Sequence, residues 1–127
     1  MSLRDNLCEA LRHLGADPSA YEFDDHSTIV MTFDDVGEIF LDPQQDARVW
    51  MWGTLQDLDD SARDLLAAEL LREIVRPTPH WEAGAMVLRE DGRTGGLLHP
   101  ECVAAPILLA SALQDFHQCL LRLQAIR

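Results

Sequence analysis

Lysine is absent from this 127-residue sequence, and all ten of its basic residues are arginines. Cysteine is scarce and widely spaced, at Cys8, Cys102 and Cys119. An odd number of distant cysteines predicts free thiols rather than a disulfide framework. No apolar run approaches the roughly 20 residues of a membrane-spanning helix. The first residues also lack the apolar core of a secretory signal peptide, so we expect a cytoplasmic protein.

The usual signatures of catalysis and of metal or cofactor binding are missing as well. Residues 92–96 are rich in glycine but lack the Walker lysine and a following helix. Residues 24–27 read Asp-Asp-His-Ser, yet adjacent residues rarely face one another and no strand–turn–helix elbow surrounds the serine. The His and Cys residues of segments 99–102 and 117–119 fit no standard zinc spacing. We therefore predict a protein that is not an enzyme and that needs no metal and no cofactor.

Acidic residues dominate the charge, which is −12 at neutral pH. Residues 1–60 hold 14 acids against three arginines, whereas residues 61–127 hold eight acids against seven arginines. A field of this sign repels nucleic acid and anionic membrane, and it favours basic or polar partners. Solubility alone explains the same composition equally well.

The chain has the size of one domain, residues 1–127, with enough apolar residues for a core. Helical spacing of leucines, Ser2 as an N-cap and Gly15 beyond the last turn predict a helix over residues 3–14. A second helix is expected from Asp60 to Val75, because three aspartates precede it and Pro77 follows it. A third is expected from Pro106 through Leu123.

Five short runs rich in β-branched and aromatic residues predict strands, over residues 28–33, 38–41, 48–55, 85–89 and 94–98. The first three are joined by short acidic turns, which favours an antiparallel meander. The Asp-Gly pair at 91–92 suits a turn between the last two. The order α-β-β-β-α-β-β-α predicts an α+β domain with a twisted antiparallel sheet and three helices.

The sheet carries large apolar side chains on both faces. Since strand residues alternate between faces, Ile29, Met31 and Phe33 share one face of the first run, and Trp50 and Trp52 share one face of the third. Helices of the chain can cover one sheet face. The other needs a further helix, a second subunit or a ligand, so these five residues are our candidates for binding a polypeptide partner.

The predicted second helix is apolar over an arc wider than one sheet face requires. Leu66, Leu70 and Ile74 lie on this arc, and we expect them to form the interface of a homodimer. A helix this apolar can also lie deep in its own core, which is the alternative.

Three segments carry a family resemblance. The sequence from Asp25 to Asp34 is similar to the acidic-His-Ser segment that enters the first strand of the invasion protein B / surface presentation of antigens protein K family. Val49-Trp50-Met51-Trp52 resembles that family's strand of alternating hydrophobic residues, and residues 113–118 resemble its closing helix. The chain thus looks like a class I type III secretion chaperone, and residues 76–103 depart most from the pattern.

The resemblance implies a non-enzymatic homodimer in the bacterial cytosol. Such chaperones bind an N-terminal, largely unfolded segment of secreted effectors and hold it export-competent for the secretion ATPase. They contact no nucleic acid and do not insert into membranes. The acidic charge leaves one alternative from another class, a small inhibitor or DNA mimic that binds a basic partner.

Overall fold

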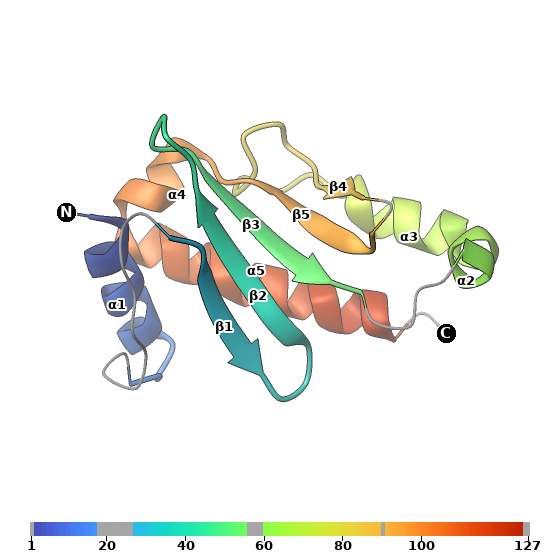
Figure 1. The fold of residues 1–127 in the computed structure, drawn as a ribbon, viewed down its shortest axis with the longest axis horizontal. Coiled ribbons are helices and arrows are strands. Elements are labelled where there is room, and N and C mark those ends of the chain that lie inside the picture. The colour runs from blue at the N-terminus through green and yellow to red at the C-terminus, as the bar shows by residue number, and fades with distance from the viewer. Residues whose placement is uncertain (1, 18–26, 56–59, 90, 126–127) are drawn as a thin grey trace.

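A computed structural model describes residues 2–17, 27–55, 60–89 and 91–125 (Figure 1). Five helices and five strands follow one another in that part of the chain: α1 (Leu3–His13), β1 (Ile29–Phe33), β2 (Gly37–Pro43), β3 (Val49–Thr54), α2 (Asp60–Leu65), α3 (Ala67–Ile74), β4 (Val87–Leu88), β5 (Arg93–Leu97), α4 (Pro100–Ala104) and α5 (Pro106–Gln124). The strands form one antiparallel sheet in the order β1-β2-β3-β5-β4. The predicted α+β class and the predicted meander of the first three strands are confirmed.

Helix α1 has the ends that its sequence predicts. The Ser2 hydroxyl accepts a hydrogen bond from the backbone N–H of Asp5 at 3.2 Å, which satisfies one of the N–H groups left open at a helix start. Gly15 follows the helix with a φ of +84°, a conformation that glycine adopts without a steric penalty. These two residues fix the length of the helix.

One face of the sheet, which we call the inner face, packs against α5, and α1 packs against α5 beside it. Buried Ile29, Met31, Leu41, Val49 and Met51 form one cluster with α5 residues that include Leu113, Phe116 and Leu120 and with Leu7 and Leu11 of α1. Figure 1 shows α5 running behind the sheet along most of its width. Burial of this apolar surface is the main favourable term in the stability of the domain.

Two glycines of the inner face bring the covering layer close to the sheet. A Cβ atom on Gly53 would lie 2.8 Å from both Leu120 methyl carbons. A Cβ atom on Gly96 would lie 2.7 Å from the Trp81 ring, which in turn meets Phe116 edge-on with centroids 5.5 Å apart. Gly96 of β5 therefore makes room for Trp81 in the core, although a glycine weakens the strand itself.

The helix expected over residues 60–75 is wrong in one respect, because the structure divides it into α2 and α3 at Leu66. Leu66 has φ −104° and ψ 10° and caps no helix with its side chain. Leu65, before the break, lies in solvent, whereas Leu70 and Ile74, after it, lie in the core.

The region between α3 and α5 differs most from the predicted elements. Strand β4 has two residues instead of the five expected, because the N–H of Met86 donates to the carbonyl of Ile74 at 3.1 Å and not to a neighbouring strand. The short helix α4 was not predicted. His99 caps it by accepting a hydrogen bond from the N–H of Glu101 at 3.2 Å, and Pro100 occupies its first turn.

Candidate functional site

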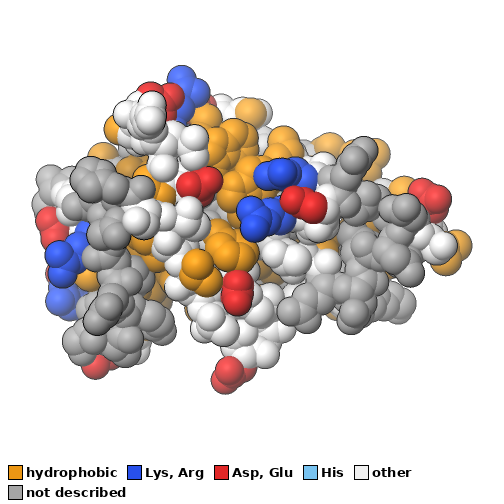
Figure 2. Space-filling view, in the orientation of Figure 1, with side chains coloured by type: hydrophobic (Ala, Val, Ile, Leu, Met, Phe, Trp, Pro, Cys, Tyr) orange, Lys and Arg blue, Asp and Glu red, His pale blue; other side chains and the backbone are white. Residues whose placement is uncertain are grey.

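The face of the sheet opposite α5 carries a set of apolar side chains that we call the aromatic face. It consists of Val30, Phe40, Trp50, Trp52, Val87 and Leu97, contributed by all five strands. Strand pairing places Val30 beside Phe40, Phe40 beside Trp52, and Trp50 beside Leu97. In Figure 1 none of the labelled helices crosses this side of the described part of the sheet. Figure 2 shows hydrophobic side chains across the middle of this side of the molecule.

The two tryptophans form the centre of the aromatic face. Their rings are stacked, with centroids 5.0 Å apart and planes 9° from parallel. Trp52 is 8% exposed, whereas Trp50 is half-buried. A stacked pair presents one rigid apolar platform, because each ring restricts the other.

Two arginines lie over the rings at one end of this platform. The guanidinium carbon of Arg89 lies 5.6 Å from the centre of the Trp52 ring, and that of Arg93 lies 5.1 Å from the centre of the Phe40 ring. Both distances are within the range of cation–π attraction. The arginine stems extend the apolar surface, and their charged groups remain in water.

The five residues predicted to bind a partner divide between the two faces. Trp50 and Trp52 lie on the aromatic face, whereas Ile29 and Met31 are buried on the inner face. Phe33 is half-buried at the end of β1, with its ring 5.3 Å from that of His117. Met31 and Phe33 also line a mostly apolar groove of about 330 Å³ between α1, β1 and α5. The structure thus brings the tryptophans together and places the β1 residues under the helices.

The residues predicted to form a dimer interface lie mostly within the protomer. Leu70 and Ile74 belong to the core, and Leu66 packs against it. The large apolar side chains of α2 and α3 that are exposed are Leu65, 82% exposed, and Leu71, 60% exposed, with Val75 after α3 at 53%. Leu71 and Val75 lie four residues apart and so share one side of α3, whereas Leu65 lies on α2 before the break; we call these three exposed side chains the apolar stripe, which a second protein surface could cover.

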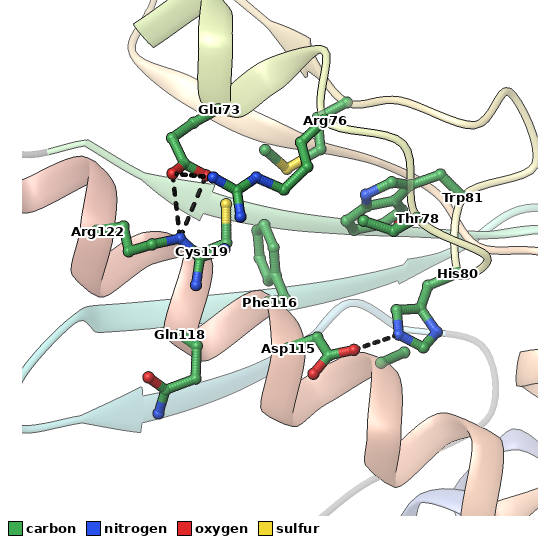
Figure 3. Close-up of a pocket in the computed structure, with 12 residues that line it drawn as sticks. Glu73, Arg76, Thr78, His80, Trp81, Asp115, Phe116, Gln118, Cys119 and Arg122 are labelled. Atoms are coloured by element: carbon green, nitrogen blue, oxygen red, sulfur yellow. Dashed lines mark hydrogen bonds and ion pairs between the residues drawn. The ribbon is translucent and has the colours of Figure 1, made fainter. Parts of the chain in front are cut away.

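A cavity of about 320 Å³ lies between α5 and the segment that follows α3 (Figure 3). The Glu73 carboxylate accepts hydrogen bonds from Arg76 at 3.0 Å and from Arg122 at 3.1 Å. Nε2 of buried His80 lies 2.6 Å from the Asp115 carboxylate. Figure 3 shows the Arg122–Glu73 pair tying α3 to α5, and the His80–Asp115 pair tying the loop after α3 to α5, on either side of Phe116. The charged groups of the cavity are thus engaged with one another.

Three further titratable residues, outside the ion pairs of the cavity, have shifted pKa values that fit structural roles. Burial raises the pKa of the Cys119 thiol to about 11 and raises the pKa of the Cys102 thiol as well. A hydrogen bond with His117 at 2.9 Å lowers the pKa of the Asp35 carboxyl below its ordinary 3.8. Thiols with raised pKa values are poor nucleophiles and poor metal ligands.

Within the described ranges, no three His, Cys, Asp or Glu side chains come together as a possible metal site. All three cysteines are free. The Asp-Asp-His part of the triad-like segment at 24–27 lies outside the described residues. No helix of the described chain is both long and apolar enough to span a bilayer.

Sequence reasoning missed Phe40, Arg89 and Arg93 as members of this site. Phe40 lies between Ile39 and Leu41 on one strand, so its side chain must point to the face opposite theirs, and the sequence could have predicted this. The arginines gave no such signal, because their position depends on the pairing of β4 with β5 and of β5 with β3.

The described part of the sheet thus has helices on one face and, on the other, apolar side chains that include the partly exposed Val30, Trp50 and Val87. The sequence profile of the Invasion protein B family matches residues 15–92, more than half of the chain. The chain belongs to this family, as its sequence suggested, and membership associates it with type III secretion. A comparison with curated proteins finds no match.

Proposed function

We propose that this protein is a class I type III secretion chaperone of the bacterial cytosol. It binds the N-terminal, non-globular segment of secreted effectors and keeps that segment competent for export by the secretion ATPase. It catalyses no reaction. The single observation that carries this proposal is the aromatic face, which lies on the sheet surface opposite α5. Family membership supports the same function.

The physical chemistry of the aromatic face suits an unfolded partner. A segment that orders on binding loses conformational entropy, so it needs a wide apolar contact surface to compensate. Five strands contribute side chains to this face, and tryptophan is over-represented among the residues that dominate binding energy. Among the described strands β1 has a neighbour on one side alone, so its other edge can pair with an added strand.

The proposed active form is a homodimer. The support is the apolar stripe formed by Leu65, Leu71 and Val75, which faces away from the protomer core. Leu70 and Ile74, on the other side of α3, hold the helix to the core and so present the stripe. A dimer would double the length of surface that one effector segment can wrap.

Binding is tested with purified N-terminal segments of effectors encoded near this gene, using calorimetry and Trp52→Ala. Removing the ring truncates the aromatic platform, and truncations at such positions often cost 2 kcal/mol or more. We expect affinity to fall roughly tenfold or more. Raising salt to about 0.5 M should shift affinity much less, because screening acts on the charge contribution alone.

The control is Ile107→Ala, which removes an exposed apolar side chain on α5, away from the aromatic face. It should leave affinity within about twofold. Melting temperatures of both variants separate loss of binding from loss of folding. A folded Trp52→Ala protein with unchanged affinity, together with binding abolished by salt, would refute the proposal.

Dimerisation is tested by light scattering at micromolar concentration. Leu71→Glu should give a folded monomer, since it adds a charge to the exposed stripe without entering the core. Leu70→Glu should instead unfold the protein, because it places an unpaired charge in the core. Ile107→Glu is the matched control and should leave the dimer intact. A monomeric mass for the unmodified protein would contradict the dimer.

A further inference from the structure

The aromatic face of this acidic protein carries two arginine side chains at one end. Arg89 and Arg93 lie directly opposite one another at the β4–β5 end of the sheet, where the N–H of Arg89 donates to the carbonyl of Arg93 at 2.8 Å. Both side chains turn over the rings of the aromatic face. Figure 2 shows Arg side chains gathered beside the exposed hydrophobic patch.

Like charges directly opposite one another across two strands destabilise a sheet. Asp91 in the connecting turn compensates Arg89, at a distance of 3.5 Å between Nη2 and a carboxylate oxygen. Among the carboxylates that the structure describes, none lies within ion-pair distance of Arg93. Asp91 is thus paired with Arg89 and not with Arg93; the Arg89 side chain is 53% exposed, and Arg93 is exposed as well.

The opposite end of the aromatic face carries a carboxylate. Asp42 pairs with Trp50 across β2 and β3, and its carboxylate accepts a hydrogen bond from the Thr28 hydroxyl at 3.2 Å. At the Trp52 end the exposed Glu38, two residues before Phe40 on β2, lies on the same face, so the two arginines have Glu38 and Asp91 as acidic neighbours. The guanidinium groups that lie over rings are at this end, so a bound segment meets a different charge pattern at each end of the face.

We propose that the aromatic face selects an acidic-apolar polypeptide segment, whose apolar side chains cover Trp50 and Trp52 and whose Asp or Glu lies between Arg89 and Arg93. This inference rests on the proposed function and names the chemistry of the segment that is bound. A carboxylate at that place pairs with both guanidinium groups and relieves their repulsion. Apolar contact supplies most of the affinity, and the arginines determine which apolar segments bind preferentially.

The preference is opposite to what the net charge of −12 predicts. An acidic protein attracts basic segments at long range. At contact distance a segment on this face meets Arg89 and Arg93, which lie over its rings, and screening at physiological salt removes attraction beyond roughly 8 Å. A basic segment would therefore gain in encounter rate, whereas an acidic-apolar segment gains in residence time.

The test uses an array of random 12-residue peptides, probed with the intact purified protein. We expect wild-type protein to enrich peptides that combine aromatic or aliphatic residues with Asp or Glu. The strongest binder is then synthesised with each acid changed to Gln, and affinities are measured by fluorescence anisotropy. Loss of the acids should weaken binding about threefold to tenfold, in keeping with two partly exposed ion pairs.

The double variant Arg89→Gln/Arg93→Gln should keep binding apolar peptides. Its affinities for the acidic peptide and for the Gln form of that peptide should differ by less than twofold. The matched control, Arg12→Gln/Arg72→Gln, makes the same change in net charge on α1 and α3 and should keep the full preference. Circular dichroism of both variants confirms that each is folded.

Each other outcome overturns the inference. If wild-type protein binds apolar peptides without preferring acids, or if the preference persists in Arg89→Gln/Arg93→Gln, the arginines do not select, and the proposed chaperone function still stands. If wild-type protein binds no peptide at all, both proposals fail. If Trp50→Ser converts a dimer into a monomer, a second copy of the chain occupies this face instead.

Discussion

Gly53 of β3 lies close to Leu120 of α5, and this contact gives a quantitative prediction for Gly53→Ala. The new methyl carbon would lie 2.8 Å from Cδ1 and Cδ2 of Leu120. Ordinary carbon–carbon contacts lie at about 3.5–4.0 Å, so roughly 0.7 Å of overlap must be relieved. Leu120 is fully buried on α5, where its neighbours in the core restrict the shift.

Overpacking of this kind costs about 1–3 kcal/mol. Replacing glycine by alanine would by itself stabilise the protein by about 0.4–1 kcal/mol, because it reduces the entropy of the unfolded chain. The overlap outweighs that gain, so we expect the free energy of unfolding to fall by about 1–2 kcal/mol. Urea denaturation followed by far-ultraviolet circular dichroism, at one fixed protein concentration, measures the difference.

A double-mutant cycle identifies Leu120 as the cause. Leu120→Ala alone should cost about 2–5 kcal/mol through the cavity that it leaves. In Gly53→Ala/Leu120→Ala the new methyl group enters that cavity. The loss in free energy of unfolding of the double variant should therefore be smaller, by at least about 1 kcal/mol, than the sum of the losses in the two single variants. Thr54→Ala, on the opposite face of the same strand, is the control and should change stability by less than about 1 kcal/mol. Single costs that add to within about 0.5 kcal/mol would refute this account of the packing.

Two further predictions concern titratable groups. The hydrogen bond with His117 lowers the pKa of Asp35 in the folded state, so nuclear magnetic resonance should show this carboxyl titrating below 3.8. The stabilisation from the pair should be fully present above about pH 4 and lost as the pH falls through the folded-state pKa. In His117→Gln the midpoint should return toward 3.8, and a wild-type midpoint at or above 3.8 would contradict the observed hydrogen bond. Cys8 is partly exposed, whereas Cys102 and Cys119 are buried with raised pKa values, so at pH 8 a thiol reagent should label Cys8 first. Cys119, with a pKa of about 11, is thiolate in roughly one molecule in a thousand at that pH, and labelling it as fast as Cys8 without denaturant would show that the core is open.

Local chemistry was enough to predict much of this fold. The cap at Ser2, the glycine after α1 and the proline that opens α5 each act within a few residues, so the ends of those helices could be predicted. Alternation along β1 and β3 correctly grouped the side chains by face. These features depend on neighbouring residues and on backbone geometry alone.

The choice of covered face could not be predicted, because it depends on contacts between distant segments. Both faces carry large apolar groups, so composition does not favour either one. The outcome follows from Gly53 and Gly96, which let Leu120 and Trp81 approach the inner face closely. The same limit applies to the break at Leu66, where the core holds Leu70 and Ile74 and leaves Leu65 outside.

The helix that covers the sheet follows every strand in the chain, and this order has a consequence for synthesis. A ribosome makes β1 to β5 before it makes α5, so Ile29, Met31, Met51 and their neighbours have no cover until residues 106–124 emerge. During that interval the nascent sheet is apolar on both faces and exposes unpaired strand edges, the features that make folding intermediates prone to aggregate. We therefore expect the yield of native protein to rise when α5 is completed and docks quickly.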